Sequence, residues 1–322
     1  MPQLTLGLDI GGTNIKTVLL DGAGRVRHRA RWKTAAMGVG HDAILDNLEA
    51  AIRGALERRG LADRDLAGLG LACAGLVRED PGRLERVPNF PHWEGLTLGP
   101  WLAARFACPT ALANDVNALA WGEWRLGAGR GTRHMICLAL GTGVGGGLVL
   151  DGRLYTGREG MGAELGHMVV DRGGRRCPCG NRGCLEAYAG ARAIAAAARR
   201  ALARRRPGHR ALAARLAGAA PGPAALERAA RDGDPLALAL WDEAGRALGV
   251  AVASYVNIFA PDRIVIAGGV SRAGRLLLDP ARAEARARLM NAAAQRLDLR
   301  LRALGDDGAA TGAALLAREK RP

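Results

Sequence analysis

Two segments of this chain share one pattern, in which a short apolar strand runs into a glycine-rich turn and a second strand follows. The first segment reads GLDIGGTN from residue 7, and the second reads LALGTGVGGG from residue 138. Glycines allow a turn to approach a phosphate closely and to point successive backbone N–H groups at it. Either turn alone would be explained by a tight hairpin. Two turns of matching form, in a chain of 322 residues that is long enough for two domains, indicate two related halves and a nucleotide cleft.

Neither turn is one of the common nucleotide fingerprints. Gly141, Gly143 and Gly146 satisfy G-x-G-x-x-G, but that fingerprint needs a helix directly after the glycines, and here the strand-like sequence LVLDGRLY follows. Lys16 resembles the lysine of a Walker A loop, but Ile15 stands where the preceding glycine belongs. Phosphate binding is therefore expected from backbone N–H groups, helped by the hydroxyls of nearby threonines.

The rest of the chain alternates strands and helices, which predicts an α/β fold. Apolar residues at helical spacing predict a helix over about 42–59. Residues 235–269 predict a long apolar helix, a tight loop and a buried strand that ends in two glycines. The Ala/Arg-rich segment 191–232, which three prolines interrupt, predicts only short helices.

Three cysteines crowd into eight positions as Cys177-x-Cys179-x4-Cys184, with His167 ten residues upstream. Four such ligands are the number that tetrahedral zinc takes. A thioredoxin-type centre would need C-x-x-C, while an iron–sulfur cluster with one histidine and a set of unligated thiols stay as alternatives. A closed four-ligand site leaves no position for a substrate, so we expect a structural site that orders a loop with little hydrophobic core.

Other residues around the cysteine cluster have simpler interpretations. Glu164 and Glu186 bracket the cluster, so a rigid loop would hold both carboxylates as fixed acceptors for a polyol; surface solvation is the alternative for either one alone. Cys73, Cys108 and Cys137 each stand alone in apolar sequence and are expected in the core.

The formal net charge of +15 raises nucleic acid as a partner. Arginine supplies almost all of the basic charge, aromatic residues make up only 4% of the chain, and no basic stripe is interleaved with aromatics, so we expect a generic basic surface and no nucleic-acid partner.

No apolar run approaches the roughly 18 to 20 residues that span a bilayer, and no secretory signal precedes the first strand. We therefore expect a cytoplasmic protein without a membrane partner.

Together these segments resemble the motifs of the ROK-family sugar kinases, over about residues 4–317. The motifs that carry the resemblance are, in chain order, LDIGGTNIKTVLLD, ANDVNALAWGE, LGTGVGGGLVLDG, GAELGH, CPCGNRGCLEAYAG, IVIAGGV and LGDDGAATGAALLA. The resemblance implies an α/β actin-like/hexokinase (ribonuclease H-like) ATPase fold, with two lobes around a central cleft. Residues 1–117 would form the small lobe, rejoined by a C-terminal helix at about 306–322, and residues 118–305 the large lobe with the zinc loop and nucleotide site.

The resemblance also implies roles for individual residues. Asp115, in ANDVN, matches the base that takes the proton from the attacking sugar hydroxyl; from the sequence alone it is equally well a helix N-cap. Matches to sugar-contacting residues fall at Gly75, Asn89, Asn114, Asp115, Glu164, His167 and Glu186. Contacts to ATP and its catalytic Mg²⁺ are expected at Asp9, Gly11, Gly12, Thr13, Lys16, Gly141, Thr142, Gly143, Gly268 and Gly269. The structural Zn²⁺ would be bound by His167, Cys177, Cys179 and Cys184.

The activity that the resemblance implies is ATP-dependent phosphorylation of glucose to glucose 6-phosphate, in a protein expected to be a homo-oligomer. A kinase of N-acetylmannosamine or N-acetylglucosamine is the nearest alternative, and Ala74, where the family usually has proline, bears on this choice of sugar. A ROK repressor would carry a winged helix-turn-helix before the first glycine turn, where only eight residues precede Asp9. A sugar-binding protein without activity would be expected to have lost Asp115 or the phosphate turns.

Overall fold

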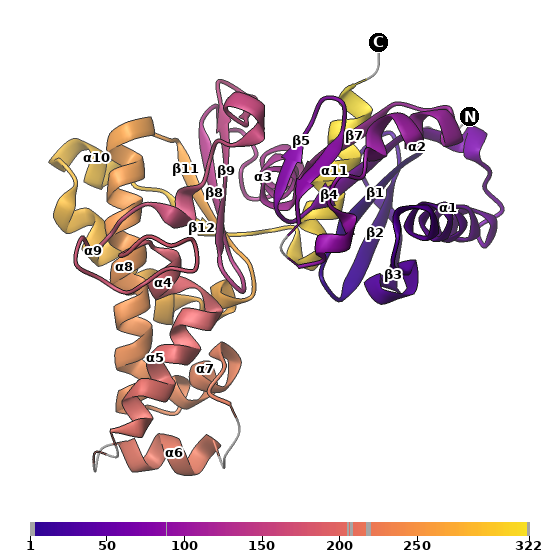
Figure 1. Ribbon diagram of the computed structural model, residues 1–322. Helices are drawn as coiled ribbons and strands as arrows, with labels where there is room; N and C mark the ends of the chain where they lie inside the picture. Colours follow the sequence, from indigo (N-terminus) through magenta and orange to yellow (C-terminus); the bar gives the residue numbers. More distant parts are fainter. Residues whose placement is uncertain (1–3, 88, 205, 207–208, 217–219, 321–322) are drawn as a thin grey trace.

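The computed structural model describes residues 4–87, 89–204, 206, 209–216 and 220–320, and its architecture is built on two five-stranded sheets (Figure 1). The first sheet has the order β3-β2-β1-β4-β7 and consists of β1 (Leu4–Ile10), β2 (Asn14–Leu20), β3 (Val26–Lys33), β4 (Leu66–Cys73) and β7 (Thr110–Asn114). The second has the order β10-β9-β8-β11-β12 and consists of β8 (Met135–Leu140), β9 (Val144–Leu150), β10 (Arg153–Tyr155), β11 (Arg263–Ala267) and β12 (Leu299–Leu301).

The two sheets have the same topology. In each, the first three strands form an antiparallel meander, and two later strands then add in parallel beside the first strand of the meander. Each glycine turn joins the first two strands of its sheet. The first turn joins β1 to β2, and the second joins β8 to β9. The two related halves predicted from the matching turns are therefore present, and the strand β9 confirms that the G-x-G-x-x-G glycines here are not followed by the helix of a dinucleotide site.

Helices cover both sheets. Around the first sheet lie α1 (His41–Glu57), α2 (Leu98–Phe106), α3 (Asp115–Leu126) and α11 (Gly308–Glu319), together with the small hairpin of β5 (Leu76–Arg78) and β6 (Arg83–Arg86). The other helices are α4 (Glu186–Ala189), α5 (Ala191–Ala203), α6 (Arg210–Leu216), α7 (Pro223–Arg231), α8 (Pro235–Phe259), α9 (Arg275–Arg288) and α10 (Asn291–Arg296). The helices expected over about 42–59 and after residue 235 are confirmed as α1 and α8, and the 191–232 segment forms the short helices α5, α6 and α7.

The C-terminal helix α11 returns to the first sheet, where it lies beside β1 and β4 (yellow in Figure 1). Gly7 of β1 and Gly70 of β4 permit this approach, because a Cβ at either position would overlap a backbone carbonyl of α11. The helix also crosses α3 closely, since a Cβ on Gly312 would overlap Ala118 O. Buried apolar residues of β2, α3, β8, β11 and α11 form one shared cluster, so α3 and α11 connect the two sheets.

The predicted boundary between residues 117 and 118 falls inside α3, which is one continuous helix. The division at that point stays a prediction, and residues 1–3 and 321–322 of the predicted ranges lie outside the described residues. Cys73, Cys108 and Cys137 are buried and free, as expected. Among the described helices, none combines the length and apolar character that a membrane span requires.

Candidate active site

Three parallel strands of the first sheet end side by side, and the residues at their carboxyl ends begin the site. The register pairs Ile10 of β1 with Cys73 of β4, and Cys73 with Asn114 of β7. Asp9, near the end of β1, and Asp115, directly after β7, therefore lie at the same end of the sheet, with β4 between their strands. Because neighbouring strands are about 4.8 Å apart, the backbones of these two residues are roughly 10 Å apart.

Asp9 faces Lys16 across the first hairpin. The Lys16 ammonium lies 3.2 Å from Asp9 Oδ2 and donates to the backbone carbonyl of Asp306, also at 3.2 Å. Burial raises the pKa of Asp9; the ammonium of Lys16 opposes this increase, and the carboxylate of Asp307 adds to it. Asp307 is itself paired with Arg29 at 2.5 Å, as Asp9 is with Lys16, so the raised pKa of Asp9 reflects burial first of all.

Asp115 is the first residue of α3, but it is not the N-cap. Asn114 fills that role, because its Oδ1 accepts from Val116 N at 2.8 Å and from Asn117 N at 3.2 Å. The Asp115 carboxylate is half-buried and accepts one hydrogen bond, from Val116 N at 3.0 Å. Burial, with the nearby carboxylate of Asp9 next in importance, raises the pKa of Asp115 to about 6. The N-cap interpretation of Asp115 is therefore wrong, and a pKa of this size suits a general base near neutral pH.

Asn114 and Gly75 meet beside Asp115. The Asn114 side-chain amide donates to Gly75 O at 3.0 Å, so most of its hydrogen-bonding capacity is used within the protein. Gly75 has a φ of 112°, a conformation that favours glycine. A glycine at position 75 therefore suits the backbone path of the loop that follows β4.

The first glycine turn consists of Gly11, Gly12 and Thr13. It is closed by Gly11 N donating to Asn14 O at 3.1 Å, and Thr34 donates from its hydroxyl to Gly11 O at 2.5 Å. The exposed Asn89 lies over Gly12, since a Cβ on that glycine would be 3.4 Å from Asn89 Cβ. The predicted sugar residue Asn89 and the predicted phosphate turn are therefore neighbours.

The second glycine turn, Gly141–Thr142–Gly143, lies between three elements. Gly141 O accepts from Ala191 N of α5 at 2.9 Å, and Gly268, which follows β11, lies against the backbone of Leu140. The start of α3 packs on β9 directly after the turn, since a Cβ on Gly145 would overlap the Val116 side chain at 2.5 Å. This contact places the residue before Val116, Asp115, near the second turn as well as beside the first sheet.

The predicted zinc ligands come together. One ligand atom from each of His167, Cys177, Cys179 and Cys184 lies within 4.8 Å of all the others, and Cys179 Sγ is 3.7 Å from Cys184 Sγ. Sulfur atoms about 2.3 Å from a tetrahedral zinc ion are roughly 3.8 Å apart, so the four residues fit such an ion. Backbone hydrogen bonding from Asn181 lowers the pKa of Cys179, whereas burial raises the pKa of Cys177 and of Cys184.

Both glutamates that bracket the cluster contact it. His167 has Nδ1 3.6 Å from Cys177 Sγ and Nε2 4.0 Å from Glu164 Oε2, the arrangement in which a carboxylate orients a metal-binding imidazole. Glu186 has Oε1 3.8 Å from Cys177 Sγ, while its Oε2 accepts from Val144 N at 2.9 Å and lies over Gly143. Glu186 therefore connects the cluster to the second glycine turn.

Three acidic residues at the junction of the two sheets were not singled out from the sequence. Asp306 accepts from Arg272, at 3.0 Å, and its backbone carbonyl contacts Lys16; Asp307 is near enough to Asp9 to affect its pKa. Glu123 of α3 is fully buried and accepts backbone N–H groups of Ala128, Ala303 and Leu304. The motifs LGDDG and AWGE contain these residues, but only the fold reveals their partners.

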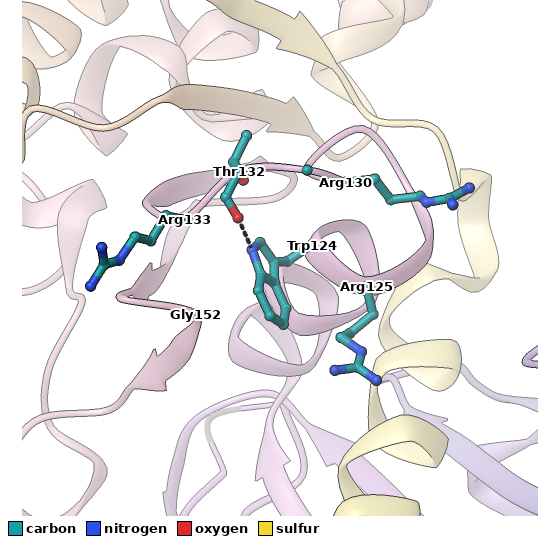
Figure 2. A pocket seen from close by; sticks show the side chains of 7 residues that line it. Trp124, Arg125, Arg130, Thr132, Arg133 and Gly152 are labelled. Atoms are coloured by element: carbon teal, nitrogen blue, oxygen red, sulfur yellow. Dashed lines mark hydrogen bonds between the residues drawn. The ribbon is translucent and has the colours of Figure 1, made fainter.

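A cavity of about 460 Å³ lies at the C-terminal end of α3, whereas Asp115 is at the N-terminal end of that helix, and Figure 2 shows the lining of the cavity. Its arginines do not converge: Arg130 and Arg133 point in different directions, and Arg125 points towards α11. Arg133 pairs with Asp151 at 2.8 Å, and Arg125 pairs with a carboxylate of α11 at 3.3 Å. This cavity is no part of the candidate active site.

The fold and the site define a two-lobed phosphotransferase of the hexokinase type. The ROK family model matches residues 5–320, so the chain belongs to the ROK family. A glucokinase of Thermotoga maritima is 37% identical over 99% of both chains. The ROK family glucokinase of Streptomyces griseus, solved in complex with glucose and AMPPNP, is 35% identical with a TM-score of 0.79, covering 98% of this chain and 99% of that one.

A ROK family transcriptional regulator, a homolog of the E. coli MLC protein, is 28% identical with a TM-score of 0.87, covering 98% of this chain and 78% of that one. The family therefore includes regulators on the same fold. The predicted family, the actin-like/hexokinase fold and the enzyme class of a hexokinase-type phosphotransferase are confirmed by these comparisons.

Proposed function

We propose that this protein phosphorylates D-glucose to glucose 6-phosphate with ATP as the donor and Asp115 as the general base. The observation that carries the proposal is the half-buried carboxylate of Asp115, with its pKa raised to about 6, at a strand end near both glycine turns. The glucokinases of T. maritima and S. griseus, the latter solved with glucose and an ATP analogue, support glucose and ATP as the substrates.

Asp115 would accept the proton of the sugar hydroxyl as that oxygen attacks the terminal phosphorus of ATP. Phosphoryl transfer depends chiefly on positioning and on charge stabilisation, so a base within hydrogen-bond reach of the nucleophile and donors around the phosphates are the main requirements. The backbone N–H groups of the turns 11–13 and 141–143, with the hydroxyls of Thr13 and Thr142, would hold the phosphates. Gly268 and Gly269 would lie near the adenosine.

Asp9 would hold the magnesium ion of Mg-ATP, directly or through water. Burial raises the pKa of both Asp9 and Asp115; the carboxylate of Asp307 adds to the increase at Asp9, that of Asp9 adds to the increase at Asp115, and Lys16 lowers both, which is an environment that a divalent cation relieves. The ion would neutralise phosphate charge, and Lys16 would help to orient Asp9.

The sugar would be held by Asn89, Asn114, Glu164, His167 and Glu186, next to Gly75. We propose that a structural zinc ion bound by His167 and the three clustered cysteines fixes the loop that carries Glu164. Its ligands leave no position for substrate, so its role would be to order acceptors for the sugar hydroxyls. Because the proposed donor, Mg-ATP, is available in the cytoplasm, we also propose a cytoplasmic location. The homo-oligomer and the 117/118 division remain predictions.

The test is a coupled assay of ADP release with Mg-ATP and a panel of glucose, mannose, fructose, glucosamine, N-acetylglucosamine and N-acetylmannosamine. The expected result is a strong preference for glucose. Preference for an N-acetylated sugar would keep the mechanism and overturn the substrate. No turnover with any sugar, in folded protein with zinc bound, would overturn the kinase proposal; sequence-specific DNA binding would then support a regulator.

A further inference from the structure

A buried tyrosine is hydrogen-bonded to the backbone of the turn that carries Glu164 and His167. Tyr255 belongs to α8, is fully buried, and donates its phenolic hydroxyl to Leu165 O at 2.5 Å. Leu165 O also accepts from Met168 N at 3.2 Å, which closes the short 3₁₀ turn Leu165–His167. The phenol therefore fixes a carbonyl between the two side chains that the proposed function uses.

The opposite side of this turn is held equally closely. A Cβ on Gly166 would overlap Val144 O, and one on Gly146 would be 2.6 Å from the Leu165 side chain. The turn therefore packs between α8 and β9. It contacts β9 at Val144, the residue directly after the second glycine turn. The hydrogen bond from Tyr255 holds the turn against α8, and the contact with β9 holds it next to the second glycine turn.

The side chains next to the anchored carbonyl point away from the core. Glu164 is 67% exposed and His167 is 33% exposed, whereas Leu165 between them is buried in the same cluster as Tyr255. A small rotation of the turn about the Leu165 carbonyl would therefore move both exposed groups together. Since the imidazole must keep one nitrogen towards Cys177 and the other towards Glu164, such a rotation would disturb both contacts.

We propose that Tyr255 is a positioning residue for sugar binding, which acts through Leu165 O on Glu164 and His167. This inference rests on the proposed function. Tyr255 contacts no substrate; it limits the orientations of the turn so that the carboxylate and the imidazole are held ready before the sugar arrives. Preorganisation of this kind affects sugar affinity and leaves the nucleotide side unchanged.

The test compares Tyr255→Phe with Tyr155→Phe. The first change removes one hydroxyl and keeps the ring, and the second removes a hydroxyl from a tyrosine of β10 that is 47% exposed. Glucose binding is measured by calorimetry without nucleotide, and KM for ATP is measured at saturating glucose. Loss of one neutral hydrogen bond predicts a glucose Kd raised about 3- to 10-fold in Tyr255→Phe, with KM for ATP changed less than about twofold. Tyr155→Phe should match the wild type in both.

A double-mutant cycle separates positioning from general loosening. In a Glu164→Gln background, Tyr255→Phe should raise the glucose Kd by a smaller factor than it does in the wild type, because one of the two groups that it positions has lost its carboxylate while His167 remains. Amide hydrogen exchange provides a readout that needs neither sugar nor activity: the peptide covering residues 163–170 should exchange faster in Tyr255→Phe, and peptides of β1 and β2 should not.

Three results would overturn the inference: equal glucose affinity in Tyr255→Phe and Tyr155→Phe, equal losses for glucose and ATP, or additive effects with Glu164→Gln. Failure of the proposed function would look different. A wild-type protein that neither binds nor phosphorylates glucose overturns that function, and unchanged exchange over residues 163–170 would then also overturn the anchoring role of Tyr255.

Discussion

Replacing Asp115 by asparagine should abolish most of the activity and, at the same time, stabilise the fold. The side chain keeps its size, and an amide oxygen can still accept from Val116 N, so the local geometry is preserved. What disappears is a carboxylate that the folded protein disfavours in its ionised form, through burial and through the charge of Asp9.

The magnitude follows from the pKa. A value of about 6 in the folded protein against the ordinary 3.8 corresponds to about 3 kcal/mol, at roughly 1.4 kcal/mol for each pKa unit. Because the folded pKa is raised, the ionised carboxylate lowers the free energy of unfolding of the wild type as pH rises from about 4 to 6, and the full loss is present above pH 6. Asparagine does not titrate, so the advantage of Asp115→Asn should be small at pH 4 and reach about 3 kcal/mol at pH 7 and above.

The assay is urea unfolding of the wild type and Asp115→Asn at pH values from 4 to 8, without nucleotide or Mg²⁺. The quantity of interest is the difference between the two free energies of unfolding, because all other titrating groups are common to both proteins. A difference that stays constant with pH, or an asparagine variant less stable than the wild type at pH 7, would refute the reasoning. Turnover of the same variant should fall about 10²- to 10⁴-fold, with glucose binding nearly intact.

Three further outcomes are expected. A pH–rate profile should show that kcat/KM for glucose decreases at pH values below about 6, because Asp115 of the free enzyme becomes protonated there. A flat profile between pH 5 and 8 would contradict the role of Asp115 as the base. Cys184→Ser should lose zinc, measured by elemental analysis, and should weaken glucose binding, whereas full affinity in the zinc-free variant would disprove the structural role. Glu123→Gln should lower the free energy of unfolding by at least about 2 kcal/mol, because an NH₂ donor replaces an acceptor oxygen that faces three backbone N–H groups. As a control, Glu319→Gln, at a partly exposed position, should change the free energy of unfolding by less than about 1 kcal/mol.

The local elements of this fold follow from patterns within short stretches of sequence. The apolar stripe that predicted a helix over about 42–59 forms α1 (His41–Glu57), and the glycine turns at 11–13 and 141–143 each join two strands. In each case the physical cause is local: side-chain periodicity selects the element, and glycine permits the turn. The ligand atoms of Cys177, Cys179 and Cys184 also meet largely because their spacing brings them together within one loop.

The sequence by itself therefore determined which groups are available: two phosphate-type turns, a set of four zinc-type ligands and a carboxylate directly after a buried strand. The tertiary structure alone decided how those groups act on one another. Burial of Asp115, together with the strand order that puts Asp9 at the same end of the sheet, raises the pKa of Asp115. The geometry at the start of α3 makes Asn114, and not Asp115, the N-cap of that helix. Tyr255 reaches Leu165 across 90 residues of sequence. Such pairings depend on how separate elements pack, and no periodicity within one element encodes a distance to another.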